Sequence, residues 1–553
     1  MRETNVWRLT MHFFRRFFEN DLVPGGEDVL TTVIRALAIV TAPGLMFAFW
    51  LQNQYPQRTP WGRLEDEYFF VMFSFVTMAG VAVFEWEMLF PDRLDFLVLT
   101  PLSLRKWEMP TAKATALAMF FGLFLASTNV FGILMLPGIT GPHFWRQVGA
   151  QAAATLSAGM FGALLITLLG GALLCVVPSR MFRTVSLVFR MLAVTVLCLV
   201  VIHYGRFGDL MPQLLADGGR RMRSVPTFWF LGLYQELQHG GAAPAFAFWM
   251  MRRAASMLTL VVVGVALVYP LAWIRMQRMA IEEEGRRAAK PSRWMSDAVH
   301  CVVRSPEERA VFHFVGQTIT RNSRYQVYMA IYFGVGLALA ISSAIDVQVR
   351  NGAATPAVSS FGLHAVMPLL VFWSIAGVKM ACAFPLQLHA KWVFRTTGAA
   401  LAKCVTAARK WALGCGLTVV FAVTGMLVCV GWNPRKLIVQ AVCGVCLCAL
   451  LVDGFFFAQT TVPFSQPRRP GKTNLPMILT LYIGVLAPFI FGMIFLELRI
   501  ERNLLLLIAP VALVPTVHWF SIHLRERSVL IEEEREGNDG EFQLLGLAGE
   551  LSS

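Results

Sequence analysis

Phe90-Pro91-Asp92-Arg93-Leu94 and Phe384-Pro385-Leu386-Gln387-Leu388 are two copies of one pattern, almost three hundred residues apart. Each pentapeptide closes a long apolar run and precedes a polar, basic stretch and then another apolar run. Further along, Val177-Pro178 and Val462-Pro463 each end a later apolar run. A pattern that recurs at a similar offset predicts a duplicated structural unit, an arrangement common in membrane proteins with many spans.

The composition predicts an all-α polytopic membrane protein. The chain is 56% hydrophobic and 15% charged, with a mean hydropathy of +0.59. A helix needs about 20 consecutive apolar residues to cross a bilayer, because lipid cannot satisfy exposed backbone groups. About twelve transmembrane helices of this length are expected: residues 31–51, 68–89, 114–136, 148–177, 184–204, 254–274, 325–345, 359–383, 411–430, 437–458, 477–496 and 504–524.

The basic residues indicate topology and not a nucleic-acid partner. The net charge is +14, but the Lys and Arg residues concentrate between alternate spans, above all in 275–324 and 391–410. This distribution is the positive-inside bias. It predicts a multi-pass protein of the cytoplasmic (plasma) membrane with both termini in the cytoplasm. Anionic lipid headgroups are an expected secondary partner, and no nucleic acid is expected.

The expected organisation is two parallel six-helix repeats, since an even number of spans returns the chain to its starting side. The first unit is 1–274, a charged cytoplasmic linker follows at 275–324, the second unit is 325–524, and a loose or surface-bound acidic tail occupies 525–553. An amphipathic surface helix precedes each unit: Arg309 and His313 repeat the pattern of Arg8 and His12. No cleavable signal peptide is expected at the N-terminus.

The patterns that suggest enzyme chemistry are weak. Gly471-Lys472-Thr473 resembles the end of a phosphate-binding loop, but Pro467 and Pro470 lack the amides that such a loop requires. Cys443, Cys446 and Cys448 approach a metal-ligand spacing, yet they lie within an apolar run without a nearby His and are expected to be packing residues. We therefore expect neither an enzyme nor a bound metal or cofactor.

Charged residues within or bordering the spans are candidate functional sites. A charge at mid-bilayer costs about 2.5–3.5 kcal/mol on insertion scales, so it usually faces a partner or a wet cavity. The repeat places Glu85 opposite Lys379, and the two are expected either to pair or to snorkel separately to the headgroups. The full set of these charges is Arg35, Glu85, Glu87, Arg190, Lys379 and Asp453.

In this layout the chain resembles the type-2 ABC transporter permeases, with two six-span units fused on one polypeptide. The resemblance implies a surface helix at Trp7–Phe18 and a re-entrant external element at Val225–Leu237. It also implies cytoplasmic coupling segments, at 91–113 and 385–410, that dock on two copies of a separate ATP-binding subunit. The implied coupling residues are Asp92, Arg93, Asp95, Arg105 and Lys106 in the first segment, and His389, Lys391, Trp392, Phe394 and Arg395 in the second.

The resemblance implies a permease subunit of an ATP-driven exporter. The second half departs from the family pattern, because its external loop at 499–503 is too short for a re-entrant element. Two other functions fit the sequence. A secondary transporter driven by an ion gradient would also contain repeats and would need a polar site near mid-membrane. A membrane scaffold without transport activity is the other alternative.

Overall fold

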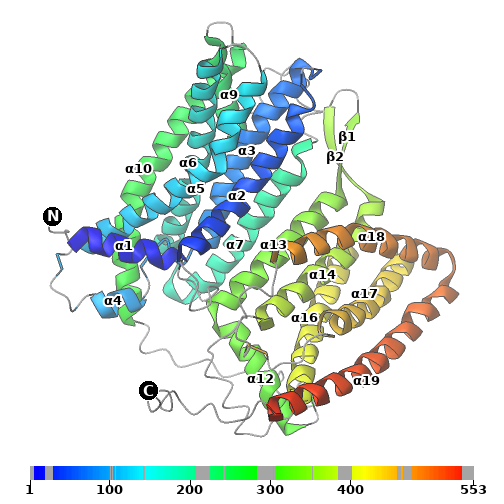
Figure 1. The fold of residues 1–553 in the computed structure, drawn as a ribbon. Helices are drawn as coiled ribbons and strands as arrows, with labels where there is room; N and C mark the ends of the chain where they lie inside the picture. The colour runs from blue at the N-terminus through cyan, green and yellow to red at the C-terminus, as the bar shows by residue number, and fades with distance from the viewer. Residues whose placement is uncertain are drawn as a thin grey trace. The chain divides into compact units, whose positions relative to one another are not determined.

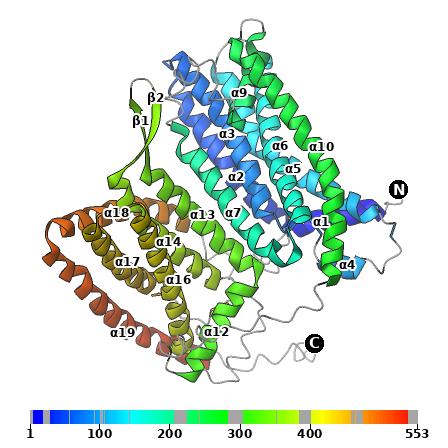
Figure 2. The same cartoon turned by 180° about the vertical axis from the view of Figure 1, so that it is seen from behind.

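The computed structural model describes residues 5–18, 29–55, 57–91, 93–99, 101, 104–105, 107–140, 143–205, 224–240, 243–282, 303, 305–350, 353–383, 401–457, 463–464 and 475–538. The chain divides into two compact units, which are described separately. Unit 1 consists of Met1–Ala288 with Asn351–Ala353, and unit 2 of Ala289–Arg350 with Ala354–Ser553. Figures 1 and 2 show the helices of each unit from opposite sides.

The described part of the chain is predominantly helical, and 11 of its helices are long and apolar enough to cross a membrane. Their windows reach mean hydropathies of 1.8 to 2.7. This confirms the coarse prediction of a helical, multi-pass membrane protein. The remaining expected span, 477–496, falls within the helix Leu475–Arg502, which is not among the 11. The side chains at the start of that helix lie outside the described part.

Unit 1 is a helical bundle with a short helix and a surface helix at one end (Figure 1). Helices α3 and α6 pack closely because glycine lets their backbones approach: a Cβ added to Gly162 would lie 2.7 Å from the carbonyl oxygen of Phe75. The helices are α1 (Asn5–Phe18), α2 (Val29–Gln52), α3 (Pro60–Phe84), α4 (Arg93–Leu99), α5 (Glu108–Thr140), α6 (Phe144–Val176), α7 (Ser179–Ile202), α9 (Pro226–His239) and α10 (Ala245–Glu282).

The two ends of unit 1 carry different short helices. α1 lies across the end of the bundle where α4 is found, and α9 lies at the opposite end of α10 (Figures 1 and 2). The apolar face of α1 packs on α5, where Phe17 stacks on Phe120 with ring centroids 4.6 Å apart. α9 covers most of the stretch expected to dip into the membrane, and its residues Thr227–Gly232 are buried.

Unit 2 is built around α14, which is buried along most of its length. Two short strands pair between α13 and α14. The elements are α12 (Pro306–Arg321), α13 (Ser323–Ala344), β1 (Ile345–Arg350), β2 (Ala353–Val358), α14 (Ser360–Ala383), α16 (Leu401–Cys429), α17 (Pro434–Phe455), α18 (Leu475–Arg502), the 3-10 helix η5 (Leu504–Leu507) and α19 (Ile508–Asn538).

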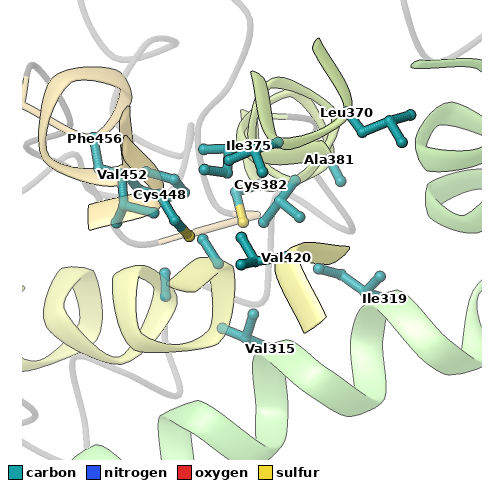
Figure 3. Packing of buried hydrophobic residues seen from close by; sticks show 14 of the residues in the cluster. Val315, Ile319, Leu370, Ile375, Ala381, Cys382, Val420, Cys448, Val452 and Phe456 are labelled. Atoms are coloured by element: carbon teal, nitrogen blue, oxygen red, sulfur yellow. The ribbon is translucent and has the colours of Figure 1, made fainter. Parts of the chain in front are cut away.

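The core of unit 2 joins residues of α12, α13, α14, α16 and α17, and Figure 3 shows part of it. Val315 of α12, Ile375 of α14, Val420 of α16 and Cys448 of α17 belong to one buried cluster. α12 therefore docks on the bundle through apolar residues, as expected for an amphipathic surface helix. Cys448 is a free thiol that fills space in this core, and Cys443 and Cys446 are likewise free and buried.

The helix α19 extends beyond the boundary placed at residue 525. It continues as far as Asn538 and includes the acidic run Glu532–Glu534. Glu has a high helix propensity and no Pro or Gly precedes Gly537 in this run, so the sequence contains no signal to stop the helix at the end of the span.

Candidate functional sites

The turn that ends α3 is fastened to α10. Glu85 is the C-terminal cap of α3, and its backbone N–H donates to the carbonyl oxygen of Val81 at 2.9 Å. Beyond it, the Tyr269 hydroxyl of α10 donates to the carbonyl oxygen of Leu89 at 3.2 Å. Phe90 stacks on the same tyrosine with ring centroids 5.5 Å apart. The first of the two repeated pentapeptides is thus held against the last long helix of unit 1.

The short helix α4 is held from two directions. Its Asp95 is buried and accepts a hydrogen bond from Arg16 of α1, which also forms an ion pair with it. Its Phe96 meets Trp273 of α10 edge-on, with ring centroids 5.8 Å apart. α4 therefore connects the surface helix to the last long helix, and a displacement of α4 would be transmitted to both.

The start of α5 completes this group of helices. Lys113 is 1% exposed, and its Nζ lies 4.8 Å from the ring centroid of Phe13 and 5.4 Å from that of Phe17. Cation–π contacts of this kind contribute about 2 kcal/mol or more when desolvated. We call α1, the turn Glu85–Phe90, α4 and the first turns of α5 the α1–α4 platform.

The structure describes a part of the predicted coupling residues. Asp95 lies in the platform, turned inward. Arg105 is exposed at the end that leads into α5, where its backbone N–H donates to Glu108 Oε2 at 3.1 Å. Arg93 begins α4, but its side chain is not described. The remaining coupling residues lie outside the described part: Asp92, Lys106, His389, Lys391, Trp392, Phe394 and Arg395.

Two of the predicted intramembrane charges in unit 1 meet each other. Arg190 of α7 lies 3.5 Å from Glu87, measured from Nη1 to Oε1, and its guanidinium sits 5.3 Å from the ring centroid of Trp86. The arginine side chain is 6% exposed and that of the glutamate 43% exposed. The pair therefore lies at the edge of the bundle and attaches α7 to the turn that follows α3. Arg35 of α2 is exposed.

The predicted charge in α17 of unit 2 belongs to a buried ion pair, with an exposed histidine beside it. Asp453 forms an ion pair with Arg409 of α16, and the two side chains are 3% and 6% exposed. His518 of α19 approaches from the other side, with its Nδ1 3.1 Å from Asp453 Oδ2. These three residues join α16, α17 and α19.

The repeat places Glu85 opposite Lys379. Glu85 belongs to unit 1 and Lys379 to unit 2, so the surroundings of each residue are described separately. The Nζ of Lys379 lies 5.0 Å from the ring centroid of Phe456. Glu85 caps α3 as described above. Their pairing stays a prediction.

A polar network near α9 was not identified from the sequence. Asp66 is 0% exposed and accepts hydrogen bonds from Arg58 Nη2 at 2.6 Å and from the Tyr55 hydroxyl at 3.2 Å. The hydrogen bond to Asp66 raises the pKa of Arg58 above its usual value. Burial raises the pKa of Tyr55, and the charge of Asp66 adds to that effect. One residue further, Glu67 is buried and accepts a hydrogen bond from Gln235 of α9.

A second unpredicted cluster lies in unit 2, at the end of α14 that follows the strands. His364 is 2% exposed and faces Glu497 and Glu501 of α18. Lys436 of α17 lies 3.4 Å from Glu501, measured from Nζ to Oε2. The spacing of Glu497 and Glu501, one helical turn apart at the end of an apolar run, is the signal that could have indicated this cluster.

The described residues contain no group of three or more His, Cys, Asp or Glu side chains that could hold a metal ion. The buried polar side chains found here link helices to one another. Comparison of the chain with models of known families, with curated proteins and with solved structures finds no match.

Proposed function

We propose that the chain is the membrane-embedded permease subunit of an ATP-driven exporter of the type-2 ABC class, acting with a separate ATP-binding subunit. The observation that carries this proposal is the α1–α4 platform. A short helix between the second and third long helices of unit 1 is fixed to the surface helix by Arg16–Asp95 and to the last long helix by Phe96–Trp273. A partner that pushed on α4 would move both together.

The proposal includes two parallel repeats, and the packing inside each unit supports this. In unit 1 the surface helix α1 packs on α5, and four pairs of long helices pack on each other: α3–α6, α3–α7, α5–α6 and α6–α10. The corresponding pairs in unit 2 are α12–α16, α14–α17, α14–α18, α16–α17 and α17–α19, and all of them pack together.

The repeats differ in the first pair of long helices. α13 and α14 pack along each other extensively and are joined by the strands, whereas α2 contacts α3 sparsely and packs on α5 instead. A duplicated unit that has diverged explains both the shared pairs and this difference. The short connection between α18 and η5 leaves no room for a counterpart of α9, so the two units would contribute unequally to transport.

In the proposed mechanism the chain carries out no covalent chemistry. ATP binding would close the partner subunits beneath α4 and the equivalent segment of unit 2, and the platform would pass this displacement to α1 and α10. Nucleotide can shift the equilibrium between two states of the assembly only if it binds one of them more tightly. The exposed Arg105 side chain at the entrance of α5 is available for contact with such a partner, while Asp95 acts inside the platform as a tether.

The tether gives the first test. Asp95→Arg places two positive charges together and should separate α4 from α1, so stimulation of ATP hydrolysis by transported substrate should fall by about tenfold, as expected for loss of a charge-assisted hydrogen bond. The measurement is ATPase activity of the assembly purified through a tag on this chain and reconstituted in lipid nanodiscs. The matched control is the exchanged pair Arg16→Asp with Asp95→Arg, which should recover most of the activity. Purification of the chain without any ATP-binding protein would refute the proposed function.

The runner-up is a secondary transporter driven by a proton gradient, and one observation favours it. His364, Glu497 and Glu501 form a buried titratable cluster inside the helical bundle of unit 2, and such clusters often bind protons in transporters. The two functions separate in proteoliposomes. A protonophore applied at constant ATP should leave transport intact for the ATP-driven exporter and abolish it for the proton-driven one.

A further inference from the structure

The imidazole of His364 lies between two carboxylates. Its Nδ1 is 3.1 Å from Glu497 Oε2, and its Nε2 is 3.6 Å from Glu501 Oε1. The side chains of His364 and Glu497 are each 2% exposed, and that of Glu501 is 13% exposed. Glu501 Oε1 is buried and accepts no hydrogen bond from the residues that the structure describes. A buried acceptor without a donor, beside a ring nitrogen, indicates that a proton belongs at that position.

The protonation state of the ring decides whether both contacts can be made. Ionised carboxylates only accept hydrogen bonds, and a neutral imidazole has one N–H. A neutral His364 could therefore donate to Glu497 or to Glu501, and its other nitrogen would present a lone pair to the remaining carboxylate. The imidazolium form has two N–H groups and satisfies both. Glu497 and Glu501 lie one turn apart on α18, so the doubly protonated ring binds two successive turns of that helix.

The surrounding charges agree with a bound proton. Lys436 of α17 lies 3.4 Å from Glu501, so the two carboxylates face one lysine and one histidine. With His364 protonated these four groups sum to zero, whereas Arg435, Arg499 and Arg502 of the same two helices are exposed. With His364 neutral, the buried side of the cluster carries one more negative than positive charge, which is costly.

The other elements around His364 add few titratable groups. α13 carries no acidic or basic residue after Tyr332, and α16 carries none after Trp411 apart from Cys415 and Cys429. The side chains of residues 346–356 in the strands lie outside the described part. Trp432 packs on His364 edge-on, with ring centroids 5.1 Å apart, and closes the site on that side.

The His364 cluster adds to an apolar contact between α18 and α14. In that contact Ile490 and Ile494 meet Ala365 and Leu369, and Phe489 meets Phe372 with ring centroids 5.7 Å apart. The neighbouring aromatic residues Phe491 and Phe495 are 63% and 60% exposed, which is suited to lipid. Losing the hydrogen bond to Glu497 or the charge contact with Glu501 would therefore weaken the hold on this end of α18.

We propose that His364, Glu497 and Glu501 form a proton-binding site that fastens α18 to α14 when the imidazole carries both protons. Loss of that proton loosens the end of α18 next to the strands. A metal ion fits less well, because Glu497 lies beside Nδ1 and Glu501 beside Nε2 of the ring. The possible ligand atoms therefore do not surround one common point. The site does not depend on coupling to ATP, so it can be tested apart from the proposed function.

The direct test is nitrogen-15 NMR of the full chain labelled at histidine and reconstituted in lipid bilayers. The signal that disappears in His364→Gln identifies the residue. We expect it to report an imidazolium at neutral pH and a neutral ring at alkaline pH. In Glu497→Gln, and separately in Glu501→Gln, the ratio of protonated to neutral ring at a given pH should fall by about tenfold, as expected for loss of one charge-assisted hydrogen bond.

A second measurement follows the fastening of α18. The melting temperature of the wild-type chain in nanodiscs should fall as the pH rises through the range in which the His364 signal titrates. This fall should disappear in Glu501→Gln and persist in His518→Gln, the matched control, because His518 also faces a carboxylate but holds α19. A His364 signal that is neutral at pH 7, or that titrates unchanged in both glutamine variants, would overturn the proposal.

Discussion

Asp453→Ala is expected to lower the free energy of unfolding of unit 2 by about 3–5 kcal/mol, the usual effect of removing one partner of a buried ion pair. The aspartate is 3% exposed, and the substitution leaves the guanidinium of Arg409 buried without its counterion. It also removes the acceptor that His518 faces at 3.1 Å, so α19 loses its polar contact with α17. The measurement is denaturant-induced unfolding of the purified chain in bicelles.

The control for this prediction replaces both partners of the ion pair. Arg409→Met with Asp453→Leu removes the charges together and retains most of the volume, so its stability should lie close to that of the wild type. An Asp453→Ala protein as stable as the wild type would show that these contacts do not hold α16, α17 and α19 together.

Gly362→Ala is expected to destabilise unit 2 by about 1–3 kcal/mol or more. A Cβ at this position would clash with the carbonyl oxygen of Ser343 and lie 2.5 Å from its carbonyl carbon. Both are backbone atoms of α13, which cannot move without separating α13 from α14. The strain exceeds the gain of about 1 kcal/mol that Ala has over Gly in a helix.

Gly414→Ala is the matched control, because this glycine is exposed in the middle of α16 and an added Cβ would meet nothing within 4 Å. It should be neutral or slightly stabilising, since Ala is the better helix former. Thermal unfolding of the two variants side by side checks the pair. Equal melting temperatures for Gly362→Ala and Gly414→Ala would contradict the close approach of α13 and α14.

The sequence was sufficient to predict the helices because crossing a bilayer demands long apolar runs. It placed the start of α3 too late, near residue 68, whereas the helix begins at Pro60. Hydropathy treats Asp66 and Glu67 as loop residues. They lie inside the helix because Arg58 and Gln235, from other segments, satisfy their carboxylates.

Sequence reasoning found single charges but could not identify their partners. Asp453 was identified as a candidate, whereas Arg409 and His518, which lie 44 and 65 residues away, were not (453 − 409 = 44; 518 − 453 = 65). His364 and Glu497 are likewise in contact although 133 residues separate them in the sequence. Contacts between distant helices depend on packing, which the hydrophobic pattern of one chain does not specify.

Asp95 illustrates the same limit for the coupling segment. The family resemblance placed Asp95 among the residues that dock on a partner subunit, and in the structure its side chain is buried against Arg16 of α1. The strands β1 and β2 were also not predicted. In β1 the alternation of Val347 and Val349 with polar residues is a strand signal, although a short one between two spans.

Two similarly oriented units that follow one another in the chain require a specific membrane topology, which cysteine labelling can determine. Asp92→Cys and Lys391→Cys are labelled with a membrane-impermeant maleimide from each side of the membrane, in a chain whose exposed Cys429 has been replaced. His239→Cys, at the end of α9, serves as the control for the opposite side. Residues 92 and 391 should be labelled from the cytoplasmic side and residue 239 from the external side. Labelling of residues 92 and 391 from opposite sides would contradict this topology.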